Sequence, residues 1–296
     1  MGCCSFTPEA LALASTSRFI PQKPFTVYKA VIALYFLFWC VRWPLADFDA
    51  IFLFVTYWAW YTGALYFTVS TITACLYADP QTTEPALRPA PSWRADVSGG
   101  SAPSGGRSCT PTCRGTLLCV QMFSWNVSCL GSLVVLVIFW TSLYDGSTLS
   151  SVDLNAHLFF SGIMLVDQLL VASPFRIRDL WKTELFAMTY LTFNICHYYI
   201  APDGSKLIYS ILDWARDPVV AVAYSLGTLF VLIPLFAFVH FGLFRLRECI
   251  YAAFQKTVAS SPRQLSDRLL SAEEAGRQRH PRAPQAAQTG TRYVDV

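Results

Sequence analysis

The residues best suited to chemistry gather where the fourth apolar segment of the chain begins. The sequence there reads Asp153-Leu154-Asn155-Ala156-His157. Asp153 and His157 stand four residues apart and share one face if the segment is helical. A histidine titrates near neutral pH and is suited to act as a general base, with Asp153 or Asn155 orienting its ring. Asp153 is equally suited to capping the helix, with His157 hydrogen-bonded to a neighbouring helix, so two interpretations stay open.

A general base needs a nucleophile, and Thr56 is the candidate. It lies near the start of the second apolar segment, after Asp47 and Asp49. At ~1.5 Å per residue, Thr56 would lie ~10 Å and His157 ~6 Å from the ends of their segments. The two residues therefore reach comparable depths if both segments start at the same membrane surface. A threonine in an apolar helix also commonly serves as a packing hydroxyl, which is the alternative interpretation of Thr56.

The elements that must position these residues are membrane-spanning helices. Of the 296 residues, 54% are hydrophobic and only 14% are charged, and the mean hydropathy is +0.41. Soluble domains carry nearer a quarter of charged residues. The chain holds six apolar windows long enough to cross a hydrocarbon core of ~30 Å, near 26–44, 50–76, 119–143, 154–173, 181–200 and 218–243. We therefore predict an all-α, polytopic transmembrane helix bundle with six spans.

The basic residues predict the orientation of the bundle. If the amino end is cytoplasmic, all of the 22 Lys and Arg residues fall on the cytoplasmic side except Arg42, Lys206 and Arg216. This is the known cytoplasmic bias of positive charge, and it predicts that both ends are cytoplasmic. The first apolar run ends in bulky residues, so we expect it to remain as an anchor. The expected location is the plasma membrane or the endoplasmic reticulum.

The chain is expected to consist of five parts. They are a cytoplasmic amino-terminal segment (1–25), the first two spans (26–77), a disordered cytoplasmic loop rich in Pro, Gly and Ser (78–115), the last four spans (116–252) and a disordered cytoplasmic tail (253–296). The loop and the tail have too few apolar residues to bury a core.

Polar residues inside the predicted spans are functional candidates, because they are costly in hydrocarbon. We expect an outer cavity shared with His157 to be lined by Asp167, Gln168, Asn194 and His197. Ser124, Ser128 and Ser132 form a stripe with a spacing of four residues. Such small residues predict a face that packs against another helix.

Other motifs suggest modification or partners. Cys3 and Cys4, next to the first span, are candidate lipidation sites. The carboxyl-terminal residues Tyr293–Val296 could add a strand to a PDZ domain. The net charge of +3 suggests no nucleic-acid partner. No metal-ligand spacing or phosphate-binding loop is present, so we expect no metal and no cofactor, with membrane lipids as the main partners.

Several stretches of the chain resemble the rolling-stone-like membrane proteins. They are VDLNAHLFFSGIMLVDQLLVASPFRI, LIYSILDWARDP and HFGLFRLRECIY, and the resemblance covers about 25–77 and 116–252. It implies a role in membrane processes such as myoblast fusion. The family is also distantly similar to the androgen-induced-type hydrolases, membrane enzymes that cleave fatty acid esters of hydroxy fatty acids with a Thr and a His. By motif, Thr56 in FLFVTYW and His157 in LNAH would match those two residues.

Three functions follow as hypotheses. The first is a rolling-stone-type protein that acts through membrane or partner interactions. The second is an intramembrane lipid-ester hydrolase with Thr56 as nucleophile and His157 as base. The third is a transporter, which would need a polar path past Asp167 to the cytoplasmic face.

Overall fold

The computed structural model is built of helices. It describes residues 14–17, 19–46, 48, 50–77, 111–144, 146, 148–202 and 207–279. Among these residues, the only extended pairing is an isolated bridge between Ser17 and Val171. The all-α fold class predicted from the sequence is confirmed. Cys3, Cys4 and residues 293–296, which carry the lipidation and PDZ predictions, lie outside the described residues.

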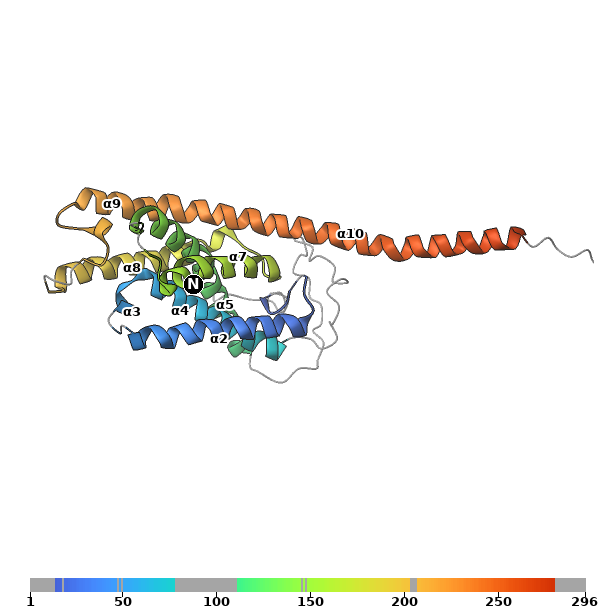
Figure 1. Ribbon diagram of the computed structural model, residues 1–296, viewed down its shortest axis with the longest axis horizontal. Helices are drawn as coiled ribbons and strands as arrows, with labels where there is room; N and C mark the ends of the chain where they lie inside the picture. Colours follow the sequence, from blue (N-terminus) through green and yellow to red (C-terminus); the bar gives the residue numbers. More distant parts are fainter. Residues whose placement is uncertain are drawn as a thin grey trace, which may run out of the picture. The chain divides into compact units, whose positions relative to one another are not determined.

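Helices occupy each of the six segments that were predicted to span the membrane (Figure 1). In chain order, the described helices are α2 (Gln22–Ala46), α3 (Ala50–Leu53), α4 (Val55–Tyr77), α5 (Pro111–Ile138), the π-helix η2 (Phe139–Leu143), α6 (Ser151–Asp153), the π-helix η3 (Leu154–Phe159), α7 (Phe160–Leu170), the 3-10 helix η4 (Ile177–Asp179), α8 (Trp181–Ile200), the 3-10 helix η6 (Ser210–Leu212), α9 (Pro218–Gly227), the π-helix η7 (Thr228–Leu232) and α10 (Ile233–Arg279).

The chain divides into two units. The first ends at Tyr251 and contains the helix bundle, and the second runs from Ala252 to Val296. Helix α10 continues to Arg279, so it includes much of the tail for which we expected no ordered structure. The part of α10 after Lys256 is rich in Gln, Arg, Leu, Ala and Glu, which are good helix formers.

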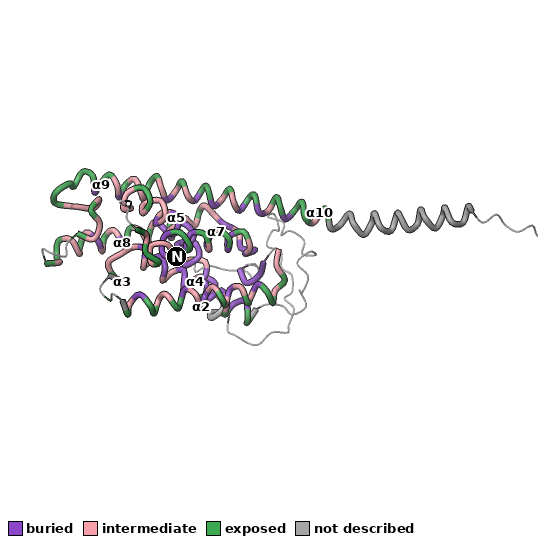
Figure 2. Tube along the Cα trace, in the orientation of Figure 1, coloured by how far each residue is buried: buried purple, intermediate pink, exposed green. Residues whose placement is uncertain are grey.

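Helices α4 and α5 form the interior of the bundle. They pack against each other, and α2 packs on α4. Figure 2 shows many buried residues in α4 and α5, whereas α2 alternates between exposed, intermediate and buried residues and α9 is mostly exposed. The predicted serine stripe of α5 is buried, and the Ser128 hydroxyl lies 3.1 Å from the Thr62 hydroxyl of α4. The stripe is therefore a helix-packing face, as the small side chains predicted.

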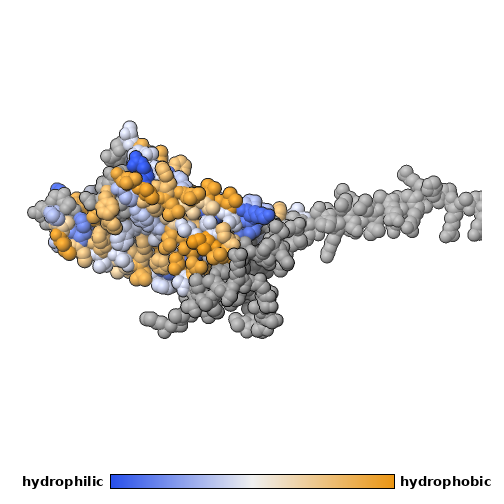
Figure 3. All heavy atoms as spheres, turned by 90° about the horizontal axis from the view of Figure 1, so that it is seen from below, coloured by the Kyte–Doolittle hydropathy of each residue, from blue (hydrophilic) through white to orange (hydrophobic). Residues whose placement is uncertain are grey.

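Within the described part of the chain, three helices are long and apolar enough to cross a membrane. They are Gln22–Leu45, Gly115–Leu143 and Pro218–Thr257. The first and third expose most of their apolar side chains, among them Leu34 and Phe230. Figure 3 shows such side chains spread over the surface of the bundle. Exposed apolar faces of this extent are stable only against hydrocarbon or another apolar surface, which fits a membrane-embedded protein.

The other three predicted spans are helical but do not meet the same combined requirement of length and composition. Helix α4 is rich in Tyr, Trp and Thr, and α8 carries Lys182 and Glu184. The stretch from Ser151 to Leu170 contains a π-helical turn. At ~1.5 Å per residue, the 20 residues of α8 would extend ~30 Å, which is long enough for a span. The count of six spans and the cytoplasmic position of both ends remain predictions.

Lys29 lies inside the bundle, although the charge count had placed it in a cytoplasmic segment. It is fully buried in α2 and forms an ion pair with the fully buried Asp167 of α7. The Tyr66 hydroxyl of α4 donates to Asp167 at 2.6 Å and accepts from Lys29 at 2.7 Å. This cluster ties three helices together. Lys29 therefore does not belong in the count of loop charges.

Candidate functional site

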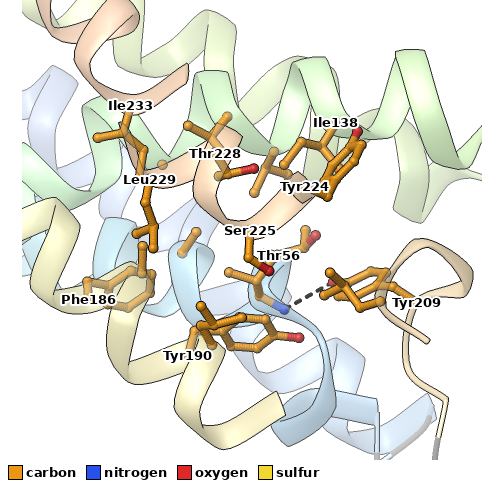
Figure 4. A pocket seen from close by; sticks show the side chains of 18 of the residues that line it. Thr56, Ile138, Phe186, Tyr190, Tyr209, Tyr224, Ser225, Thr228, Leu229 and Ile233 are labelled. Atoms are coloured by element: carbon orange, nitrogen blue, oxygen red, sulfur yellow. Dashed lines mark hydrogen bonds between the residues drawn. The ribbon is translucent and has the colours of Figure 1, made fainter. Parts of the chain in front are cut away.

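A mostly apolar cavity opens between four helical regions of the bundle (Figure 4). We call it the apolar cavity, and its volume is about 130 Å³. Its walls come from the start of α4, from α5, from α8 and from α9 with η7. The lining includes Ile138, Phe186, Leu191, Leu229 and Ile233. A space lined in this way favours an alkyl chain over a polar ligand.

A second cavity adjoins the first and has more polar walls. We call it the polar cavity, and its volume is about 360 Å³. Its lining includes Asp153 and Ser210. The residues that line both cavities are Thr56, Leu143, His157 and Tyr209. Three side chains with reactive or hydrogen-bonding groups therefore stand at the boundary between an apolar and a more polar space.

Thr56 is the second residue of α4 and is buried. At this start of the helix, the Phe54 carbonyl accepts the N–H of Tyr57 at 3.1 Å. The first N–H groups of an α-helix have no carbonyl partner within the helix, and the Val55 N–H instead donates to the Tyr209 hydroxyl at 3.2 Å. The local fold thus places Thr56 at the positive end of a helix and beside a tyrosine.

His157 lies on the π-helical turn η3 and is also buried. Its ring stacks on the ring of Phe139, with 3.7 Å between centroids and 7° between planes. The Nδ1 atom is buried and has no hydrogen-bond partner among the described residues. A buried nitrogen without a partner is costly, and π-helical turns are frequent at functional sites. One interpretation of the sequence expected a neighbouring span to hydrogen-bond this ring, and no such bond is made at Nδ1.

The side chains of Asp153 and Asn155 form hydrogen bonds with residues other than His157. Ser150 caps the helix, and Asp153 accepts from its N–H at 3.0 Å and from its hydroxyl at 2.7 Å, which completes a capping box. The Asn155 amide donates to the Ser151 carbonyl at 2.5 Å, and its oxygen pairs with the Tyr35 hydroxyl. Capping was predicted for Asp153 itself, but Ser150 occupies that position. Neither side chain is seen to hydrogen-bond the His157 ring, so the orienting role stays a prediction.

The four polar residues predicted to share a cavity with His157 line neither of the two cavities. Asp167 pairs with Lys29, and Gln168 pairs with the ring of His240 and donates to its carbonyl at 2.6 Å. Asn194 accepts from the Trp214 indole at 2.9 Å. His197 also lines neither cavity, and its buried Nδ1 atom has no hydrogen-bond partner among the described residues. The shared lining predicted for these four residues is therefore not found in the two cavities.

Neither of the two cavities provides the polar path past Asp167 that a transporter would need. Both members of the Lys29–Asp167 pair are fully buried, and neither the apolar nor the polar cavity reaches them. Among the described residues, no group of three or more His, Cys, Asp or Glu side chains could hold a metal ion.

Tyr209 is the site residue that the analysis of the sequence missed. The motif that contains it, Tyr209-Ser-Ile-Leu-Asp-Trp214, was noted only for its resemblance. Its position between two predicted spans gave no sign that it would contact the start of α4. The sequence did show a tyrosine in the short segment between the predicted spans 181–200 and 218–243, which is the only pattern that could have pointed to it.

Comparison with known proteins gives a partial match. No family model matches the chain, and no solved structure matches it. A stretch of 142 residues is 23% identical to "Protein rolling stone" of Drosophila melanogaster, which covers 46% of this chain and 51% of that protein. The chain therefore spans about half the length of the curated relative it matches. This similarity supports a rolling-stone-like relationship and, with the apolar helices, a multi-pass membrane protein.

Proposed function

We propose that this membrane protein hydrolyses a lipid ester within the bilayer, with Thr56 as nucleophile and His157 as general base. The observation that carries the proposal is that these two residues, on α4 and η3, line the same two cavities. The distant similarity to androgen-induced-type hydrolases, noted from FLFVTYW and LNAH, points to the same pair.

The reaction proceeds in two balanced steps. The Thr56 hydroxyl oxygen bonds to the ester carbonyl carbon, His157 takes the hydroxyl proton, and the carbonyl electrons move to oxygen. The intermediate collapses, the bond to the alcohol oxygen breaks, and His157 returns the proton to that oxygen. A water molecule then attacks the acylated Thr56 in the same way, which releases the acid and restores the threonine.

The two cavities could each hold a different part of the ester substrate. The acyl chain fits the apolar cavity, whose walls offer few hydrogen-bonding groups. The alcohol part and the attacking water fit the polar cavity, where Asp153 and Ser210 lie. The unpartnered Nδ1 of His157 supports a base that is free to accept a proton.

The first test is labelling of membranes with an alkyl fluorophosphonate probe. Wild type is expected to be labelled, and Thr56→Ala and His157→Ala are expected to lose the label at equal expression, because one variant lacks the nucleophile and the other its base. Thr71→Ala is the matched control. Thr71 lies on the same helix, and its hydroxyl bonds only to the Phe67 carbonyl at 2.8 Å among the contacts described.

A well-expressed wild type that takes no label would contradict the hydrolase. The rolling-stone resemblance would then stand alone, and it implies a role in a membrane process such as myoblast fusion. A cell-fusion assay on wild type and on Thr56→Ala separates the two proposals, since an interaction role does not need the Thr56 hydroxyl.

A further inference from the structure

The segment Tyr209–Trp214 forms one wall of the site. Tyr209, Ile211 and Leu212 line the apolar cavity, and Ser210 lines the polar cavity. The segment therefore places an aromatic hydroxyl and two aliphatic side chains over the start of α4. Asp213 and Trp214 line neither cavity and instead bond to a neighbouring helix.

Asp213 and Trp214 fasten this wall to α8. The Tyr198 hydroxyl donates to Asp213 at 2.6 Å, and the Trp214 indole donates to Asn194 at 2.9 Å. The Asp213 carboxylate also accepts the Arg216 N–H at 2.9 Å. The Tyr198 hydroxyl, and after it the Arg216 N–H, hold the pKa of Asp213 below its ordinary value. The carboxylate therefore stays charged at neutral pH and keeps its bonds.

The Tyr209 hydroxyl is held beside the proposed nucleophile. It accepts the Val55 N–H at 3.2 Å, as the dashed line in Figure 4 shows. It also interacts with the side chains of Thr56 and Tyr190. Burial raises the pKa of Tyr209 to about 12, so the phenol keeps its proton at neutral pH. A hydroxyl that already accepts a hydrogen bond becomes a better donor.

We propose that Tyr209 is a catalytic residue whose hydroxyl donates a hydrogen bond to the oxyanion formed when Thr56 attacks the ester. This inference rests on the proposed hydrolase function. Tyr209 transfers no proton. Negative charge builds on the carbonyl oxygen as the bond to Thr56 forms, the phenol O–H stabilises it, and the charge leaves that oxygen when the intermediate collapses.

The test compares wild type with Tyr209→Phe, purified in lipid nanodiscs, for hydrolysis of p-nitrophenyl butyrate and p-nitrophenyl palmitate. The variant keeps the ring and loses only the donor. Losing one donor to an oxyanion lowers kcat by about 10²- to 10³-fold. The KM is expected to stay within about twofold, because the interaction is made only in the transition state. Tyr199→Phe, at the exposed end of α8, is the control and should retain wild-type kcat.

The outcomes separate the inference from the function on which it rests. If wild type hydrolyses neither ester, the hydrolase proposal fails and Tyr209 has no such role. If wild type is active, Thr56→Ala is inactive and Tyr209→Phe keeps full kcat, the function stands and the role of Tyr209 is overturned.

A second measurement covers the case in which Tyr209→Phe does not fold. Difluorotyrosine at position 209 keeps the ring and the hydroxyl but ionises at lower pH. The other titratable groups that face this hydroxyl or line its cavities are Tyr57, Asp153, His157, Tyr190 and Tyr224. Because the donor exists only in the protonated phenol, hydrolysis should decline at a lower alkaline pH than in wild type. An unchanged alkaline limb would overturn the proposal.

Discussion

At the scale of single residues, the Lys29 ammonium group shows how the bundle accepts a charge. It lies 4.5 Å from the centre of the Tyr66 ring and 5.0 Å from that of Phe67, and it forms an ion pair with Asp167. Aromatic faces and a carboxylate together replace the water that the ammonium loses. A buried ion pair is costly to break, because the remaining charge has no partner, whereas replacing both members can be nearly neutral.

Breaking this pair is expected to destabilise the protein more than removing it. Lys29→Met and Asp167→Leu should each cost about 3–5 kcal/mol. The double variant should recover much of this loss, because no charge is left unpaired. Thermal unfolding in detergent micelles, followed for the full cycle of four proteins, measures the coupling. Additive losses in the double variant would show that the two charges do not interact.

At the scale of elements, the approach of α2 and α7 to α4 depends on Gly63. A Cβ atom at this position would lie 2.8 Å from a ring carbon of Phe36 and 3.1 Å from one of Phe160. Both rings belong to the buried hydrophobic core, and their centroids lie 5.6 Å apart. The missing side chain therefore lets two aromatic rings from different helices rest directly on the backbone of α4.

Gly63→Ala is expected to lower stability by about 1–3 kcal/mol through overpacking. Helix propensity alone would favour alanine by about 1 kcal/mol, so the sign of the effect decides between crowding and propensity. Gly242→Ala on α10 is the matched control, since a Cβ there meets no atom within 4 Å. It should be neutral or stabilising. The melting temperatures of both variants in the same detergent settle the comparison, and a gain for Gly63→Ala would contradict the close approach.

At the scale of the whole molecule, the number of spans fixes the topology. Among the described residues, three helices meet the requirements for a span by length and composition, and helices also occupy the other three predicted segments. An even number of spans places both ends on the same side of the membrane. The excess of basic residues in the predicted cytoplasmic segments favours the cytoplasm for both.

Epitope tags at the two ends are therefore expected to become accessible together, and only after the membrane is made permeable. Antibody staining of intact and selectively permeabilised cells measures this, and the stained membrane distinguishes the plasma membrane from the endoplasmic reticulum. A tag at either end that is reached in intact cells, with the other protected, would mean an odd number of spans.

Local patterns in the sequence determined the class of this protein. Apolar windows of about 20 residues predicted membrane helices, and helices occupy all six predicted segments. The serine stripe of α5 predicted a packing face because small side chains allow close approach wherever the partner lies. The candidate pair, Thr56 and His157, was also named from the sequence, and the two residues line common cavities.

Only the tertiary structure decided which polar groups satisfy one another. It paired Lys29 with Asp167, brought Gln168 to His240, and brought Tyr209 to the start of α4. The physical reason is that hydropathy and helical periodicity are properties of neighbouring residues, whereas burial and hydrogen bonding depend on which helices meet. A buried polar side chain takes whatever partner the packing provides, and that partner stands far away in the sequence.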